Sequence, residues 1–165
     1  MKNLIVILLI LNVVSCKESN LESNHSVASV GDTALLTTEY SSLSLEQLYD
    51  YSEVSQKLSD FKSCIPYLEE IIERDSTQGK AYFKLALCYV EQMDYNKSSY
   101  LFSKAIRLNY NPEDCYFNIA FNYFTIGNFD STIICLEKVL EINPKNNKAQ
   151  YFLERLKSNS QDKAL

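Results

Sequence analysis

One apolar pattern recurs along this chain at a fixed offset of 34 residues. Residues 82–89 read Tyr-x2-Leu-Ala-x2-Tyr, residues 116–123 read Tyr-x2-Ile-Ala-x2-Tyr, and residues 48–55 carry a weaker copy, Leu-x2-Tyr-Ser-x2-Ser. A period of this length is typical of stacked helical hairpins, in which each hairpin buries its apolar face against its neighbours. The sequence therefore predicts an all-α solenoid, an architecture that mostly binds other proteins.

Local signals predict where the helices begin and end. Ser44, with Gln47 three residues later, has the pattern of a capping box that opens a helix over 45–58. Side chains that accept hydrogen bonds from free N–H groups at a helix start recur at the turns: Asp60, Asp94 and Asn128. Later helices are predicted over about 62–74, 96–108, 130–142 and 147–158.

These columns resemble the tetratricopeptide repeat (TPR), whose pattern is aromatic-x2-Leu-Gly/Ala-x2-Tyr, a turn, two small residues and a terminal Pro. In that family the small residues let two helices approach closely, a role that falls here to Ala86, Ala120, Ser98 and Ala105. The resemblance implies three repeats within a domain over 45–158, followed by a capping helix. The repeats are 45–78, 79–112 and 113–146, and the cap is 147–158.

The residue at the turn between the two helices of a hairpin departs from the TPR pattern in two of the three repeats. Gly127 is the expected residue, whereas Met93 and Ser59 hold the same column in the other hairpins. A residue other than glycine costs about 1–2 kcal/mol there if the turn requires a positive φ.

The N-terminal residues 1–15 have the features of a lipoprotein signal peptide. The apolar run from Leu4 to Leu11 is shorter than the ~20 residues of a spanning helix and has the size of a signal-peptide core. Residues 13–16 read Val-Val-Ser-Cys and resemble a bacterial lipobox, which implies lipidation of Cys16. An ordinary signal peptide with an incidental cysteine, or an uncleaved anchor, is the alternative.

Residues 16–44 are rich in Ser, Thr and Asn, and we expect a flexible tether. The pair at 17–18 is Lys-Glu and lacks the Asp that retains lipoproteins in the inner membrane of enteric bacteria. The resemblance to bacterial lipoproteins, without that Asp, implies an outer-membrane protein facing the periplasm, with surface exposure as an alternative. Residues 159–165 are predicted to be a disordered tail.

The composition argues against several functions. The 16 Lys and Arg residues are outnumbered by 21 Asp and Glu, and no basic stripe that would bind nucleic acid is present. The single histidine, His25, lies in the tether and cannot complete a catalytic triad. Glycines stand singly, so no phosphate-binding loop is predicted. We expect no enzyme, no cofactor, no metal and no small-molecule substrate.

Four cysteines remain beyond Cys16, at 64, 88, 115 and 135. They form no Cys-x2-Cys motif and have no histidine partner, which argues against zinc. Free thiols packed as small apolar residues are the expected state. A bridge between Cys64 and Cys88, which fall at similar heights on neighbouring helices, is the alternative.

The first helix of each TPR hairpin lines a concave surface, and the helical period selects the residues that face it. We call the following set the aromatic groove: Tyr49, Phe83, Leu87, Val90, Phe117, Phe121, Phe124 and Tyr151. An exposed apolar surface of this kind could bind an amphipathic helix or an extended peptide. The alternative is that residues 27–43 fold back and cover it.

The sequence thus predicts a membrane-tethered module that binds an unidentified protein partner. An assembly or pilot factor for an outer-membrane machine, or a structural component acting through its convex face, remains open. The clamp by which some TPR proteins bind a C-terminal carboxylate is not expected, because Tyr49 and Glu53 stand where Lys and Asn are needed.

Overall fold

The computed structural model describes residues 40–162, with side chains as far as residue 158. No strand occurs within that range, and the predicted all-α solenoid is confirmed. Its helices are α3 (Leu45–Lys57), α4 (Cys64–Arg74), α5 (Gly79–Glu91), α6 (Tyr95–Arg107), α7 (Pro112–Thr125), α8 (Phe129–Ile142) and α9 (Asn147–Asp162).

The predicted signal peptide, Cys16, His25 and most of the predicted tether lie outside the described residues. The last predicted tail residues, 163–165, lie outside them as well.

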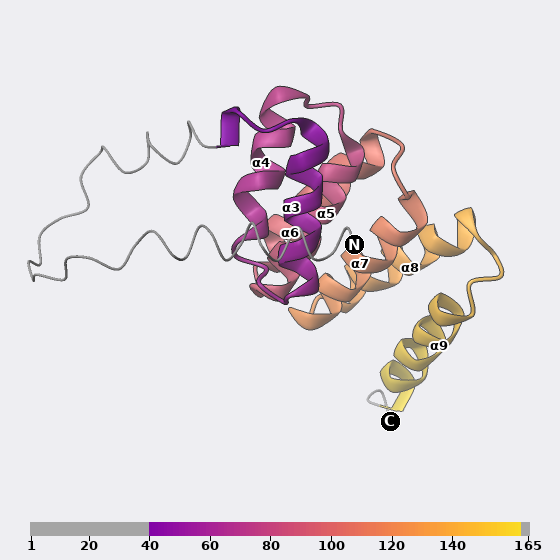
Figure 1. Ribbon diagram of the computed structural model, residues 1–165. Coiled ribbons are helices and arrows are strands. Elements are labelled where there is room, and N and C mark those ends of the chain that lie inside the picture. The colour runs from indigo at the N-terminus through magenta and orange to yellow at the C-terminus, as the bar shows by residue number, and fades with distance from the viewer. Residues whose placement is uncertain (1–39, 163–165) are drawn as a thin grey trace, which may run out of the picture. The chain divides into compact units, whose positions relative to one another are not determined.

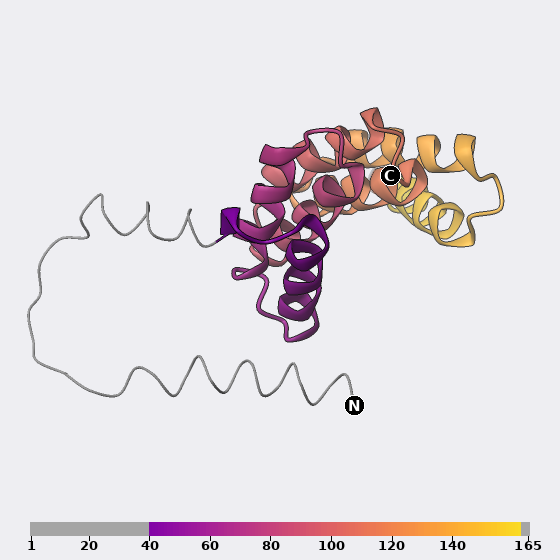
Figure 2. The same ribbon diagram turned by 45° about the horizontal axis from the view of Figure 1, so that its top comes forward.

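Each helix packs against the next one along the chain, so the domain is a succession of hairpins (Figures 1 and 2). Short turns join the helices of a hairpin and make them antiparallel neighbours. The core runs through all the hairpins and consists of apolar side chains from both helices of each one. The largest apolar side chains that are fully buried are Phe102, Leu48, Leu68, Ile71, Leu136 and Val139.

Side-chain caps begin several of the helices, as the sequence predicts. Ser44 and Gln47 form the reciprocal hydrogen bonds of a capping box at the start of α3. The carboxylate of Asp94 accepts a hydrogen bond from the N–H of Lys97 at 3.1 Å. The side-chain amide oxygen of Asn128 accepts one from the backbone N–H three residues further along the chain, at the same distance. Local sequence therefore sets these helix starts.

Helix α4 begins later than predicted, at Cys64 rather than residue 62. Asp60 still accepts a hydrogen bond from the N–H of Ser63, but residues 61–63 form turns. Pro66 has no N–H and cannot donate to the carbonyl of Lys62, so the first i→i−4 bond of the expected helix is missing.

Both ends of the described range are more ordered than predicted. Arg74 donates to the carbonyl oxygens of Tyr40 and Leu43, and the Tyr40 ring packs edge-on against Tyr67 at 5.0 Å. Residues 40–44 are thus attached to α4, whereas the sequence analysis placed them in the tether. At the other end α9 continues to residue 162, so residues 159–162 are helical and not part of a tail.

The hairpin turns place one residue each in the left-handed region. Ser59, Met93 and Gly127 have φ values of 59°, 61° and 79°. In each turn the next residue donates its N–H to a carbonyl five positions back, as Asp94 does to Tyr89 at 3.0 Å. The turn needs a positive φ, and only Gly127 adopts one without steric cost.

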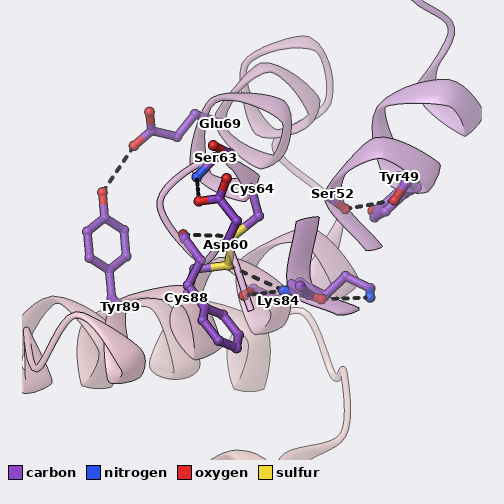
Figure 3. The surroundings of a disulfide bond; sticks show 11 residues. Tyr49, Ser52, Asp60, Ser63, Cys64, Glu69, Lys84, Cys88 and Tyr89 are labelled. Atoms are coloured by element: carbon purple, nitrogen blue, oxygen red, sulfur yellow. Dashed lines mark hydrogen bonds between the residues drawn. A yellow bond between two sulfur atoms is a disulfide. The ribbon is translucent and has the colours of Figure 1, made fainter. Parts of the chain in front are cut away.

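A disulfide bond joins Cys64 of α4 to Cys88 of α5 (Figure 3). Both residues are fully buried, and the side chain of Gln56 donates to the sulfur of Cys88 at 3.3 Å. The expectation of free thiols is therefore wrong for this pair, whereas it is confirmed for the buried Cys115 and Cys135. The bond fastens the first hairpin to the second.

The contact between the second and third hairpins uses the equivalent two positions of the repeat, but their side chains have different chemistry. Adding 34 residues to the disulfide positions gives Ser98 of α6 and Asn122 of α7. These side chains are also fully buried, and the amide nitrogen of Asn122 donates to the hydroxyl of Ser98 at 3.0 Å. A hydrogen bond thus occupies the place that the disulfide has one repeat earlier.

We expect the Cys64→Ser/Cys88→Ser double variant to lose about 3 kcal/mol of unfolding free energy. The disulfide closes a sequence separation of 24 residues, and a loop of that size contributes about this much by restricting the unfolded chain. Urea unfolding followed by circular dichroism, with and without dithiothreitol, measures the loss. Reductant should destabilise the wild type and leave the double variant unchanged; a wild type indifferent to reductant would contradict the prediction.

The turn residues allow a reciprocal test of backbone strain. Gly127→Ala should lower the midpoint of thermal unfolding by an amount equivalent to about 1 kcal/mol. No atom lies within 4 Å of the added methyl group, so only the positive φ can act. Met93→Gly should instead raise the midpoint, because Met93 is 75% exposed and loses little packing. A loss of stability in both variants would show that φ does not decide these turns.

Candidate binding groove

One face of α7 and one face of α9 enclose a pocket of about 640 Å³, which we call the α7–α9 pocket. Its residues recur every three or four positions on each helix, which puts them on a single face of that helix. The lining residues are Phe117, Phe121, Phe124, Lys148, Tyr151, Phe152, Arg155 and Leu156.

Three of the five aromatic side chains that line the α7–α9 pocket are exposed to solvent, and the other two are half-buried. Tyr151 is 65% exposed, Phe121 46% and Phe124 38%. The Phe124 ring makes an edge contact with Phe152 at 5.0 Å, which links the two walls. Exposed apolar side chains gathered in one concavity, rather than scattered singly, indicate a binding surface.

The structure brings only part of the predicted aromatic groove into this pocket. Phe117, Phe121, Phe124 and Tyr151 line it together. The remaining predicted residues are half-buried and pack against the core, and they do not line the pocket. They are Tyr49, Phe83, Leu87 and Val90.

Phe83 illustrates why those positions are less available. Its ring contacts Phe102 at 5.4 Å and Tyr110 at 5.7 Å, so it fills the space between α5, α6 and the following turn. Tyr49 is held similarly, because its hydroxyl donates to Gln78 at 3.3 Å. These side chains contribute mainly to packing between hairpins.

Phe152 and Leu156 of α9 were not among the predicted site residues. They follow Lys148 at successive steps of four, and that spacing was available in the sequence as the mark of one helix face. The helical projection onto the concave surface placed Tyr151 in the aromatic groove and missed these two apolar neighbours on the same face of α9.

The two ends of the groove differ in charge. On α3, Glu53 lies 3.1 Å from the ammonium of Lys84 and 3.6 Å from that of Lys80. The hydrogen bond from Lys84, reinforced by its charge, holds the pKa of the Glu53 carboxyl below its usual range. One carboxylate of the chain therefore neutralises part of the positive charge at this end.

The α7–α9 pocket has cations without such neutralisation. Within residues 40–158, neither Lys148 nor Arg155 has a carboxylate at ion-pair distance. None of the pocket's lining residues is acidic. The pocket is therefore an apolar concavity with positive charge on its α9 side.

Reactive groups are few in the described part of the chain. Burial raises the pKa of the Cys115 thiol to about 12, so the nucleophilic thiolate is not formed near neutral pH. Residues 40–162 contain no cluster of His, Cys, Asp and Glu suited to a metal ion. Over the same residues, no helix combines the length and apolarity needed to cross a membrane.

Comparison with known proteins identifies the repeat. Residues 113–146 match the family profile described as Tetratricopeptide repeat. A search of curated proteins finds no match to the sequence.

Solved structures extend the similarity beyond that repeat. The chain is similar to the Arabidopsis OM64 TPR domain, with 14% identity, a TM-score of 0.64, and coverage of 70% of this chain and 95% of that one. It is similar to the first TPR of Spaghetti (RPAP3) bound to an HSP90 peptide, with 18% identity, a TM-score of 0.64, and coverage of 73% and 94%. It is also similar to PcrH in complex with the chaperone binding region of PopD, with 16% identity, a TM-score of 0.66, and coverage of 72% and 97%.

Because these sequence identities are below 20%, the similarity shows the fold alone. Together with the matched repeat, it shows that the described part of the chain has the all-α helical-repeat fold of tetratricopeptide repeat proteins.

Proposed function

We propose that this chain is a non-catalytic protein-binding module that captures a partner polypeptide in its aromatic groove. A lipid on Cys16 would tether the module to the bacterial envelope, at the outer membrane and facing the periplasm. The α7–α9 pocket is the part of the groove where the partner is anchored.

The exposed aromatic lining of the pocket is the observation that carries this proposal. Phe121, Phe124 and Tyr151 leave much of their apolar surface in water within one concavity. Covering apolar surface contributes about 25 cal/mol per Å², and aromatic anchors dominate many protein interfaces. A partner segment that inserts an apolar side chain there gains this energy without any rearrangement of the core.

Two proteins of the same fold support the proposal. Spaghetti was solved bound to an HSP90 peptide, and PcrH in complex with the chaperone binding region of PopD. The absence of catalysis is argued from the sequence, since the chain's only histidine is His25 and general acid–base chemistry most often uses histidine.

The tether is supported by two independent features. The Val-Val-Ser-Cys motif at 13–16 supports lipidation, and the Cys64–Cys88 disulfide supports export, because structural disulfides persist mainly in oxidising compartments. A lipoprotein cysteine carries two or three acyl chains, and each buried CH₂ contributes about 0.8 kcal/mol to membrane binding.

Phe121→Glu should abolish partner capture, because it places a charge on the apolar floor of the pocket. Loss of an aromatic anchor weakens binding by about 30-fold or more. Crosslinking in cells followed by mass spectrometry should recover the partner with the wild type and not with the variant. Tyr100→Glu is the matched control, since Tyr100 is a 56% exposed aromatic on α6, outside the pocket. Unchanged capture by a Phe121→Glu protein of normal helicity would refute the groove as the site.

Cys16→Ala should release the protein from the membrane into the soluble periplasmic fraction, because no acyl chains can then be attached. Cell fractionation and immunoblotting measure the distribution. The Cys64→Ser/Cys88→Ser variant is the control for loss of cysteines in general and should stay with the membrane. Continued membrane association of the Cys16→Ala protein would contradict lipidation.

A further inference from the structure

The α7–α9 pocket combines an apolar floor with two cations spaced along one helix. Lys148 lies in the first turn of α9, and Arg155 follows seven residues later on the same face. A helix rises 1.5 Å per residue, so the backbone positions of the two cations are about 10 Å apart along its axis. Tyr151 lies between them, opposite Phe121 and its neighbours on α7.

These two cations set the charge of the pocket. The chain carries a net charge of −5, and at the other end of the groove Glu53 already offsets part of the charge of Lys80 and Lys84. Lys148 and Arg155 have no such partner among residues 40–158, and no acidic residue lines their pocket. Positive potential beside an apolar concavity favours a ligand that presents both an apolar group and negative charge.

Resting on the proposed function, we propose that the α7–α9 pocket binds an acidic segment of the partner polypeptide. A bulky apolar side chain of that segment enters between Phe121 and Tyr151. Carboxylates on either side of it pair with Lys148 and Arg155. An extended chain rises about 3.3 Å per residue and points successive side chains to opposite faces. Carboxylates two positions before and two positions after the anchor therefore share its face, and at about 13 Å apart they lie within reach of the two long cationic side chains.

The two parts of the interaction have different roles. The buried apolar anchor supplies most of the affinity, because it removes the exposed aromatic surface from water. The ion pairs form at a solvated rim, where each contributes modestly but steers association and rejects basic segments. Specificity for acidic segments should therefore weaken with salt more steeply than the apolar contact does.

Selection from a phage-displayed library of random seven-residue peptides tests this proposal on the immobilised full chain. We expect the selected peptides to share an aromatic or large aliphatic residue flanked by Asp or Glu. One selected peptide is then synthesised with a fluorescent label. Its Kd, measured by fluorescence anisotropy, should rise several-fold between 50 and 500 mM NaCl, roughly as expected when the Debye length shortens.

Charge reversal separates the acidic preference from general binding. Lys148→Glu/Arg155→Glu should weaken binding of the selected peptide by about tenfold or more. A repeat of the selection on this variant should yield basic flanking residues. Lys62→Glu/Lys145→Glu is the matched control, because it makes the same change in net charge at exposed positions outside the pocket. Circular dichroism verifies that each variant is folded.

The outcomes distinguish this inference from the proposed function. Peptides that bind through Phe121 but carry neutral or basic flanks, or that ignore the charge reversal, would overturn the acidic specificity and leave capture in the groove standing. Binding that survives Phe121→Glu, or a selection that enriches no peptide, would overturn both. Equal weakening by the control double variant would show a long-range effect of net charge and would also refute a direct role for Lys148 and Arg155.

Discussion

Close approach between the second helix of one repeat and the first helix of the next is the constraint on which this fold depends. It requires small side chains at two facing columns, because a larger one would hold the backbones apart. Cys64 and Cys88 occupy these columns at the first junction, and Ser98 and Asn122 at the second. All of these residues are fully buried. The same geometry thus accommodates a covalent bond in one place and a hydrogen bond in the next.

The third junction differs in its chemistry, and the proposed binding pocket lies beside it. The equivalent residues are Thr132 and Leu156, but the Thr132 hydroxyl donates to the carbonyl of Asn128 within its own helix, and Leu156 offers only apolar atoms. Leu156 packs against the core and also lines the α7–α9 pocket. Apolar contact and an exposed ion pair from Lys157 to Glu137 at 3.6 Å join α8 and α9. The last helix therefore contributes to the proposed binding surface and also covers the end of the stack.

The features predicted correctly from the sequence are those set by local chemistry. Helix caps at Ser44, Asp94 and Asn128, and a turn that needs a positive φ at Met93, each depend on a few neighbouring residues. Apart from the start of α4, where Pro66 lies in the first turn, the main errors concern contacts between helices. Equal height on adjacent helices did not decide whether two sulfurs bond, and the attachment of residues 40–44 depends on Arg74, some thirty positions away. Site prediction was limited similarly, because a helical period shows which way a residue points and not whether a neighbouring helix covers it.

The two ends of the aromatic groove differ in their exposed apolar surface and in their charge. At the α3 end the aromatic residues are packed between hairpins, so little of their apolar surface is left to bind a ligand, and two cations share the carboxylate of Glu53. At the α9 end Phe121 and Tyr151 remain exposed beside Lys148 and Arg155. A solenoid built from near-identical repeats would offer similar sites along its whole inner face. Here the departures from repetition leave exposed aromatic side chains and, among residues 40–158, unpaired cations at one end, which is why the proposed partner segment is anchored there.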